Sequence, residues 1–77
     1  MVNRQELVVC DRDILGGIPV FAGTRVPVQT LFDYLEGGDS LETFLDDFPT
    51  VTRKQVVAFL GQASNLFVQQ VSHAYSA

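Results

Sequence analysis

The sequence has 77 residues, nine of them acidic and five basic, so its formal net charge at pH 7 is -4. This length allows one small domain, near the lower limit at which a hydrophobic core alone supports a fold, although 47% of the residues are hydrophobic. We therefore expect a single domain over residues 1–77 that forms a homodimer or covers its apolar surface with another protein. The single cysteine excludes an internal disulfide framework, and no stretch resembles a signal peptide or a membrane helix, so we expect a soluble, cytoplasmic protein.

Two short apolar runs near the N-terminus predict a small β element over about residues 7–28. The first run, LVVC at residues 7–10, ends at the turn-prone Asp-Arg-Asp of residues 11–13. The second run, IPVF at residues 18–21, is bounded by glycines. We expect two or three short strands that include a hairpin.

The stretch GGIPVFAGTRVPV at residues 16–28 combines three glycines, two prolines and one arginine. It does not fit a phosphate-binding P-loop, because the glycine spacing is one residue too long, no lysine follows, and proline lacks an amide donor. Positive φ at the glycines instead predicts a structural corner. This corner consists of Gly17, Pro19, Gly23, Thr24 and Arg25. Because Arg25 lies between apolar neighbours, we expect a partly enclosed guanidinium in a structural ion pair, with ligand recognition as the alternative.

Apolar spacing of three and four residues predicts two helices in the middle of the chain. The first covers residues 28–36 and ends at Gly37-Gly38, where a left-handed conformation stops a helix. The second covers residues 40–48, begins at the N-cap Ser40 and ends before Pro49.

A third, longer helix is predicted over residues 53–74. Thr52 and Gln55 have the spacing of a capping box, and apolar residues follow along one broad side. Gly61 is the weak point of this helix. The predicted fold is therefore mainly α, with three helices in a helix-turn-helix-like order of the homeodomain or winged-helix kind, after a short N-terminal β hairpin.

The turn between the last two helices raises the possibility of DNA binding. In a helix-turn-helix, residues at the start of the second helix read the major groove, which here would be Arg53, Lys54 and Gln55. A helical hairpin without any nucleic-acid role explains the same pattern equally well. Six acidic residues and no basic residue lie between Val26 and Thr52, so nucleic acid would have to meet a local basic patch.

The pattern GGxPVxxGTRVPV at residues 16–28, followed by the glycine-terminated helix and the Asp-Phe-Pro of residues 47–49, resembles the small bacterial family called domain of unknown function 433. The resemblance covers about residues 7–63. It implies a helix-turn-helix-like, often dimeric domain that acts as an antitoxin, blocks a PIN-like ribonuclease and represses their shared operon by binding operator DNA. Family members tend to carry an acidic residue soon after the threonine of the last helix, whereas this chain has Arg53-Lys54.

The last part of the long helix is apolar beyond the compact region. The expected partner or dimer interface consists of Leu66, Phe67, Val68, Val71 and Tyr75. The alternative is a helix that folds back on the strands.

Enzymatic and metal-binding functions have little support. His73 has no nucleophile or carboxylate at triad spacing, and Cys10 is expected to be a small, buried strand residue. Glu42, Asp46 and Asp47 are more typical of a solvated helix face than of a metal site. We expect no catalytic residue, no cofactor and no metal. The prediction is an antitoxin-like interaction protein, and the alternative is a self-associating module with no nucleic-acid role.

Overall fold

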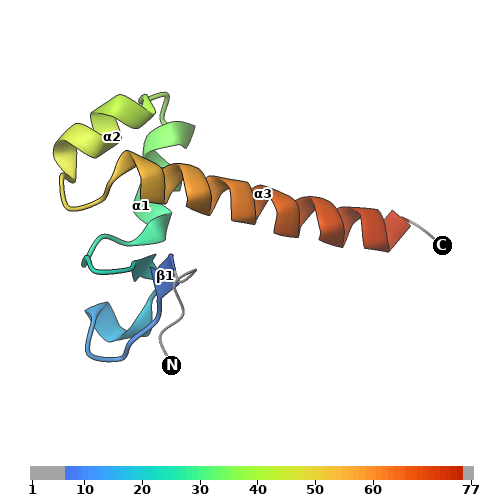
Figure 1. Ribbon diagram of the computed structural model, residues 1–77, viewed down its shortest axis with the longest axis horizontal. Helices are drawn as coiled ribbons and strands as arrows, with labels where there is room; N and C mark the ends of the chain where they lie inside the picture. The colour runs from blue at the N-terminus through green and yellow to red at the C-terminus, as the bar shows by residue number, and fades with distance from the viewer. Residues whose placement is uncertain (1–6, 76–77) are drawn as a thin grey trace.

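The computed structural model describes residues 7–75, with side chains described up to residue 72. In this part of the chain a two-stranded hairpin precedes three helices (Figure 1). The strands are β1 (Val8–Val9) and β2 (Val20–Phe21), and the helices are α1 (Val28–Glu36), α2 (Leu41–Asp47) and α3 (Arg53–Tyr75). The predicted fold, mainly α with a short N-terminal β hairpin, is confirmed.

The hairpin pairs β1 and β2 antiparallel, with Val8 opposite Phe21 and Val9 opposite Val20. Between the strands, a 3-10 turn at Leu15–Gly17 reverses the chain, and both of its glycines have positive φ, 73° at Gly16 and 97° at Gly17. The glycine pair therefore supplies the conformations that the sequence predicts ahead of β2.

The predicted corner after β2 is formed by Gly23 and Thr24. Gly23 has a φ of 77°, and the Thr24 hydroxyl donates to the Phe21 carbonyl at 2.8 Å while it accepts from the Val26 amide at 3.0 Å. Arg25 is exposed, so the expected enclosure of its guanidinium is wrong. The reason is local: Val26 turns its side chain into the core, which leaves its neighbour Arg25 facing solvent.

The helix boundaries follow the predicted caps. The Ser40 hydroxyl accepts from the Thr43 amide at 3.1 Å at the start of α2, and Thr52 accepts from the Gln55 amide at 3.0 Å at the start of α3. Gly38 follows the C-cap Gly37 of α1 and has a φ of 92°, the left-handed conformation that stops a helix. Each cap satisfies backbone groups that a helix end otherwise leaves unpaired.

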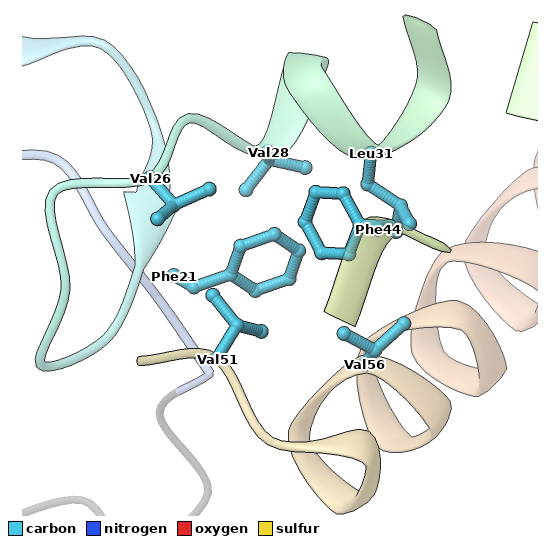
Figure 2. Close-up of a cluster of buried hydrophobic side chains, with 7 residues drawn as sticks. All are labelled: Phe21, Val26, Val28, Leu31, Phe44, Val51 and Val56. Carbon is cyan, nitrogen blue, oxygen red and sulfur yellow. The ribbon is translucent and has the colours of Figure 1, made fainter. Parts of the chain in front are cut away.

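The core lies where the hairpin, α1, α2 and the first turns of α3 meet, and its side chains converge in Figure 2. The Phe21 ring lies 6.2 Å from that of Phe44 and 5.4 Å from that of Phe59, measured between centroids. Phe44 also contacts Tyr34 and Phe48, at 5.5 and 5.1 Å. The buried cluster consists of Phe21, Val26, Val28, Leu31, Phe44, Val51 and Val56. One strand residue and one α2 residue therefore join the hairpin to all three helices.

Only the first part of α3 packs on this core, through Val56, Phe59 and Leu60. The rest of the helix extends away from the body as one straight rod (Figure 1). The radius of gyration is 14.0 Å, whereas a compact chain of this length has about 11.5 Å. The alternative in which the C-terminal segment folds back on the strands is therefore wrong.

Phe44→Ala is expected to lower the free energy of unfolding by about 3–5 kcal/mol, because the ring is fully buried and its loss leaves a cavity. This is a large share of the total for so small a domain. Urea denaturation followed by circular dichroism at several protein concentrations measures the change. Gln62→Ala, at an exposed position of α3, is the control and should stay within about 0.5 kcal/mol of the wild type. Equal urea midpoints for Phe44→Ala and Gln62→Ala would contradict the burial of Phe44 in the core.

Candidate interaction site

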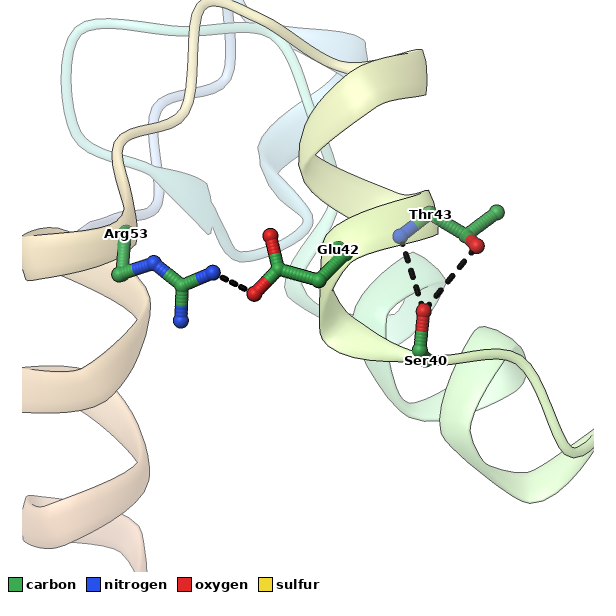
Figure 3. A network of polar contacts seen from close by, with 4 residues as sticks. All are labelled: Ser40, Glu42, Thr43 and Arg53. Atoms are coloured by element: carbon green, nitrogen blue, oxygen red, sulfur yellow. Dashed lines mark hydrogen bonds and ion pairs between the residues drawn. The ribbon is translucent and has the colours of Figure 1, made fainter.

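The N-terminal end of α3 presents Arg53 and Lys54 on the surface. Both side chains are exposed, and the Arg53 guanidinium forms an ion pair with Glu42 in the first turn of α2 (Figure 3). An exposed pair of this kind contributes about 0–1 kcal/mol to stability. The pair directs Arg53, one of the residues that the sequence predicts for DNA contact, toward the Glu42 carboxylate of α2.

Gln55, the third residue predicted to contact DNA, turns toward the hairpin. Its side-chain amide donates to the Ala22 carbonyl at 3.0 Å, with a longer contact of 3.5 Å to the Leu7 carbonyl. The side chain is therefore half-buried and holds the start of α3 against the end of β2. The amide of Gln55 completes the predicted cap with Thr52, but its side chain serves this tertiary contact, which local spacing does not reveal.

Helices α1 and α2, with the connection between them, carry an acidic surface. Its exposed members are Asp33, Glu36, Asp39, Glu42, Asp46 and Asp47. Within the described residues, no three histidine, cysteine, aspartate or glutamate side chains lie close enough to hold a metal ion. The surface is therefore a source of negative potential and not a built cation site.

The side chain of Tyr34 connects α1 to an acidic residue of α2. Its hydroxyl donates to Oδ2 of Asp47 at 2.6 Å. That hydrogen bond, together with desolvation and the negative charges of Asp47 and Asp39, raises the pKa of the Tyr34 phenol above its ordinary value of 10.0.

The projecting half of α3, residues 61–75, carries four of the five predicted interface side chains on its surface. The exposed fractions are 59% for Leu66, 67% for Phe67, 55% for Val68 and 37% for Val71. Tyr75 is the last residue of α3, and its side chain lies outside the described residues. The structure thus brings the predicted apolar residues onto one segment that the body of the chain does not cover.

This segment is also uncharged. From Gln55 to Tyr75 the sequence contains no aspartate, glutamate, lysine or arginine. In the part of the chain that the structure describes, none of the helices is long and apolar enough to cross a membrane. The projecting half is thus an uncharged, partly apolar helix attached to an acidic body.

Sequence reasoning did not predict the exposure of four apolar residues, among them Leu35 at 38%, or the exposure of Cys10. Val57 is 55% exposed, because it is rotated by about 100° around the helix from the buried Val56, away from the core. Leu15 and Ile18 are exposed in the turn between the strands, for which the sequence offers no comparable signal. Cys10 is exposed, so its expected burial is wrong, because β1 ends one residue earlier, at Val9.

Comparison with known proteins places this architecture among proteins of unknown role. Residues 8–61 match the family described as "Protein of unknown function (DUF433)". The uncharacterized protein y4eO of Sinorhizobium fredii (strain NBRC 101917 / NGR234) is 38% identical over 56 residues, a match that covers 73% of this chain. The match covers 25% of that relative, so the chain spans about a quarter of its length. No solved structure matches the chain significantly.

Removal of the Tyr34 hydroxyl is expected to change how stability depends on pH. The folded state holds the phenol proton more tightly than the unfolded state, so this contribution is complete below the ordinary pKa of 10.0 and is lost as the pH rises through the higher, folded pKa. Tyr34→Phe should therefore have a lower free energy of unfolding than the wild type at neutral pH. The difference between the two proteins should become smaller once the pH exceeds the ordinary pKa of 10.0. Urea denaturation of both proteins across the alkaline range measures the difference. A difference in free energy of unfolding that grows as the pH rises would contradict the raised pKa of the Tyr34 phenol in the folded state.

Proposed function

The chain belongs to the DUF433 family, and we propose that it acts as a non-enzymatic, antitoxin-like protein that binds and neutralises a PIN-like ribonuclease. The class of partner comes from the resemblance of its motifs to antitoxin-like members. The projecting half of α3, exposed and uncharged, is the observation that carries the proposal.

An apolar helix outside the body favours a protein partner. Leu66 and Phe67 each leave more than half of their surface in contact with water. Burial of such a side chain in a groove contributes about 1.5–3 kcal/mol, and amphipathic helices bind proteins in this way. The projecting half therefore supplies the anchor of the complex.

The acidic surface of α1 and α2 supports the same class of partner. A ribonuclease must attract the phosphates of RNA, so its substrate-binding surface carries positive potential. An acidic body complements that surface and competes with RNA for it. The anchor and the acidic surface together would hold the chain over the catalytic face of the enzyme.

Operator binding is the second candidate function, because α2, the turn and α3 leave Arg53 and Lys54 exposed at the start of α3. The ion pair with Glu42 and the inward direction of Gln55 reduce this patch to two cations, one of them occupied. We therefore expect weak binding by the isolated chain that falls steeply with salt.

Leu66→Asp is expected to weaken the complex with the ribonuclease at least tenfold, because it places a charge where the partner buries an apolar side chain. The matched control is Asn65→Asp, which adds the same charge at the neighbouring exposed position. The measurement combines calorimetry with the rate of RNA cleavage by the candidate PIN-like ribonuclease. Equal inhibition by both variants would remove Leu66 from the interface, and no inhibition by the wild type would contradict the proposed function.

The operator function has a separate test on the DNA upstream of the gene for this chain. Arg53→Ala/Lys54→Ala should reduce the slope of log affinity against log salt by about 2, since each phosphate contact contributes about 0.9. Glu42→Gln should tighten binding because it releases Arg53. Fluorescence anisotropy over a salt series measures both effects. If Arg53→Ala/Lys54→Ala leaves the salt slope unchanged and Glu42→Gln leaves the affinity unchanged, the start of α3 does not contact the DNA.

A further inference from the structure

The corner after β2 presents Arg25 on a turn that is closed by hydrogen bonds. The Phe21 amide donates to the Val26 carbonyl at 3.0 Å, and the Thr24 amide donates to the Phe21 carbonyl at 3.0 Å. The Thr24 hydroxyl adds two contacts to the same turn, and Gly23 supplies its positive φ. Because these bonds fix the chain on both sides of Arg25, the fold itself sets the backbone position of this exposed residue.

The Arg25 guanidinium has no ion-pair partner within the part of the chain that the structure describes. The one ion pair there joins Arg53 and Glu42. The turn does not require a cation either, because its hydrogen bonds use backbone groups and the Thr24 hydroxyl. The Arg25 side chain is therefore available to an anion of another molecule.

The Gln55 side chain holds this corner against the start of α3. It donates to the carbonyl of Ala22, the first residue after β2, at 3.0 Å. Arg25 comes three residues after Ala22 in the chain, so the two Cα atoms lie at most about 11 Å apart. Arg53 and Lys54 come directly before Gln55. This hydrogen bond therefore brings basic residues from two distant parts of the sequence to the same region.

Packing in the core makes the same connection. Val26 directly follows Arg25 in the chain. Val51 lies two residues before Arg53. Both valines belong to the buried cluster, and both lie beside the Phe21 side chain in Figure 2. The corner and the start of α3 are thus neighbouring parts of one packed body.

Three of the four basic residues that the structure describes lie in this region and form a basic patch. The patch consists of Arg25, Arg53 and Lys54, all of them exposed. The fourth basic residue, Arg12, belongs to the turn that joins the strands, at the opposite end of the hairpin from the Gln55 contacts (Figure 1). The patch therefore concentrates positive charge on a chain whose net charge is -4.

Exposed cations of this kind favour a polyanion over a single carboxylate of a protein. An exposed ion pair between protein side chains contributes about 0–1 kcal/mol. A cation that meets a nucleic-acid phosphate also releases a condensed counterion, which favours the contact at low salt. The pair of Arg53 with Glu42 is itself exposed, with side-chain fractions of 53% and 67%, so a phosphate can replace the carboxylate.

We propose that Arg25 contacts a phosphate of duplex DNA and extends the DNA-binding surface of α3 onto the corner after β2. This inference rests on the operator-binding candidate, and it adds a residue from outside the helix-turn-helix. With the start of α3 at the major groove, the corner meets the sugar-phosphate backbone beside that groove. Contacts to the backbone fix the position of a protein on the duplex without reading its sequence. The arginine fork can donate two hydrogen bonds to one phosphate.

Fluorescence anisotropy over a salt series tests the contact, with the DNA upstream of the gene for this chain as the probe. Three phosphate contacts of about 0.9 each give a slope of log affinity against log salt of about -2.7, which Arg25→Ala should change to about -1.8. Arg12→Ala is the matched control, because it removes the same charge from the opposite end of the hairpin and should leave the slope unchanged. Circular dichroism checks that both variants keep the fold. An equal change of slope in the two variants would overturn the contact, since net charge alone would then explain it.

Arg25→Lys separates the charge of the residue from its geometry. Lysine keeps the positive charge, so the salt slope should stay at the value of the wild type, while the loss of the fork should weaken binding severalfold. A salt slope as shallow as that of Arg25→Ala would contradict a phosphate contact at this position.

The same variants separate this inference from the functions proposed above. Arg25→Ala should inhibit the candidate ribonuclease as well as the wild type does. If the salt slope responds to Arg53→Ala/Lys54→Ala but not to Arg25→Ala, the inference is overturned and the operator function stands. If Arg25→Ala binds DNA normally but no longer inhibits the ribonuclease, the inference is also overturned, and Arg25 contacts an acidic group of the protein partner. A wild type that binds no DNA at low salt would contradict both the inference and the operator function.

Discussion

The packing of Phe21 determines the architecture of this chain. The residue ends β2, is fully buried, and contacts rings of α2 and α3 at once. Its position is set by the hairpin, whose reversal needs the positive φ values of the glycine pair before β2. The Gln55 amide adds a polar contact between the same two elements, at the Ala22 carbonyl. The direction of α3 is therefore fixed at its first turns, by the packing of Val56, Phe59 and Leu60 on the core and by the Gln55 hydrogen bond.

That fixed direction separates the chain into two chemically different parts. The body contains the apolar core and, among the side chains that the structure describes, all the charged ones, while the projecting half of α3 is uncharged and leaves large apolar side chains in water. A helix that is 23 residues long cannot lie entirely on a core built from so few residues. No other element of the described chain covers this segment, so its large apolar side chains stay in contact with water.

Local patterns predicted the fold better than they predicted the surface. The helices, their caps at Ser40 and Thr52, and the corner at Gly23 depend on the chemistry of a few neighbouring residues, and spacing alone reveals them. The apolar residues of the projecting half were also recognisable, because the compact part of the chain leaves nothing to cover them. The inward direction of the Gln55 side chain was not recognisable, because it binds the hairpin, which is far away in the sequence. The hydrogen bond of Gln55 joins residues 33 positions apart, and nothing in the capping pattern indicates it.

The length of α3 bears on how the proposed ribonuclease would be bound. The first turns of the helix pack on the core through Val56, Phe59 and Leu60, whereas Leu66 and Phe67 lie on the projecting half, which the body does not support. A helix without tertiary support is only marginally stable in water, so part of the binding free energy would be offset by the cost of holding this half in its helical form. Burial of Leu66 and Phe67 would have to exceed that cost. The acidic surface of α1 and α2 would add an electrostatic attraction that does not depend on the projecting half, so the apolar helix would set the lifetime of the complex and the acidic body its rate of formation.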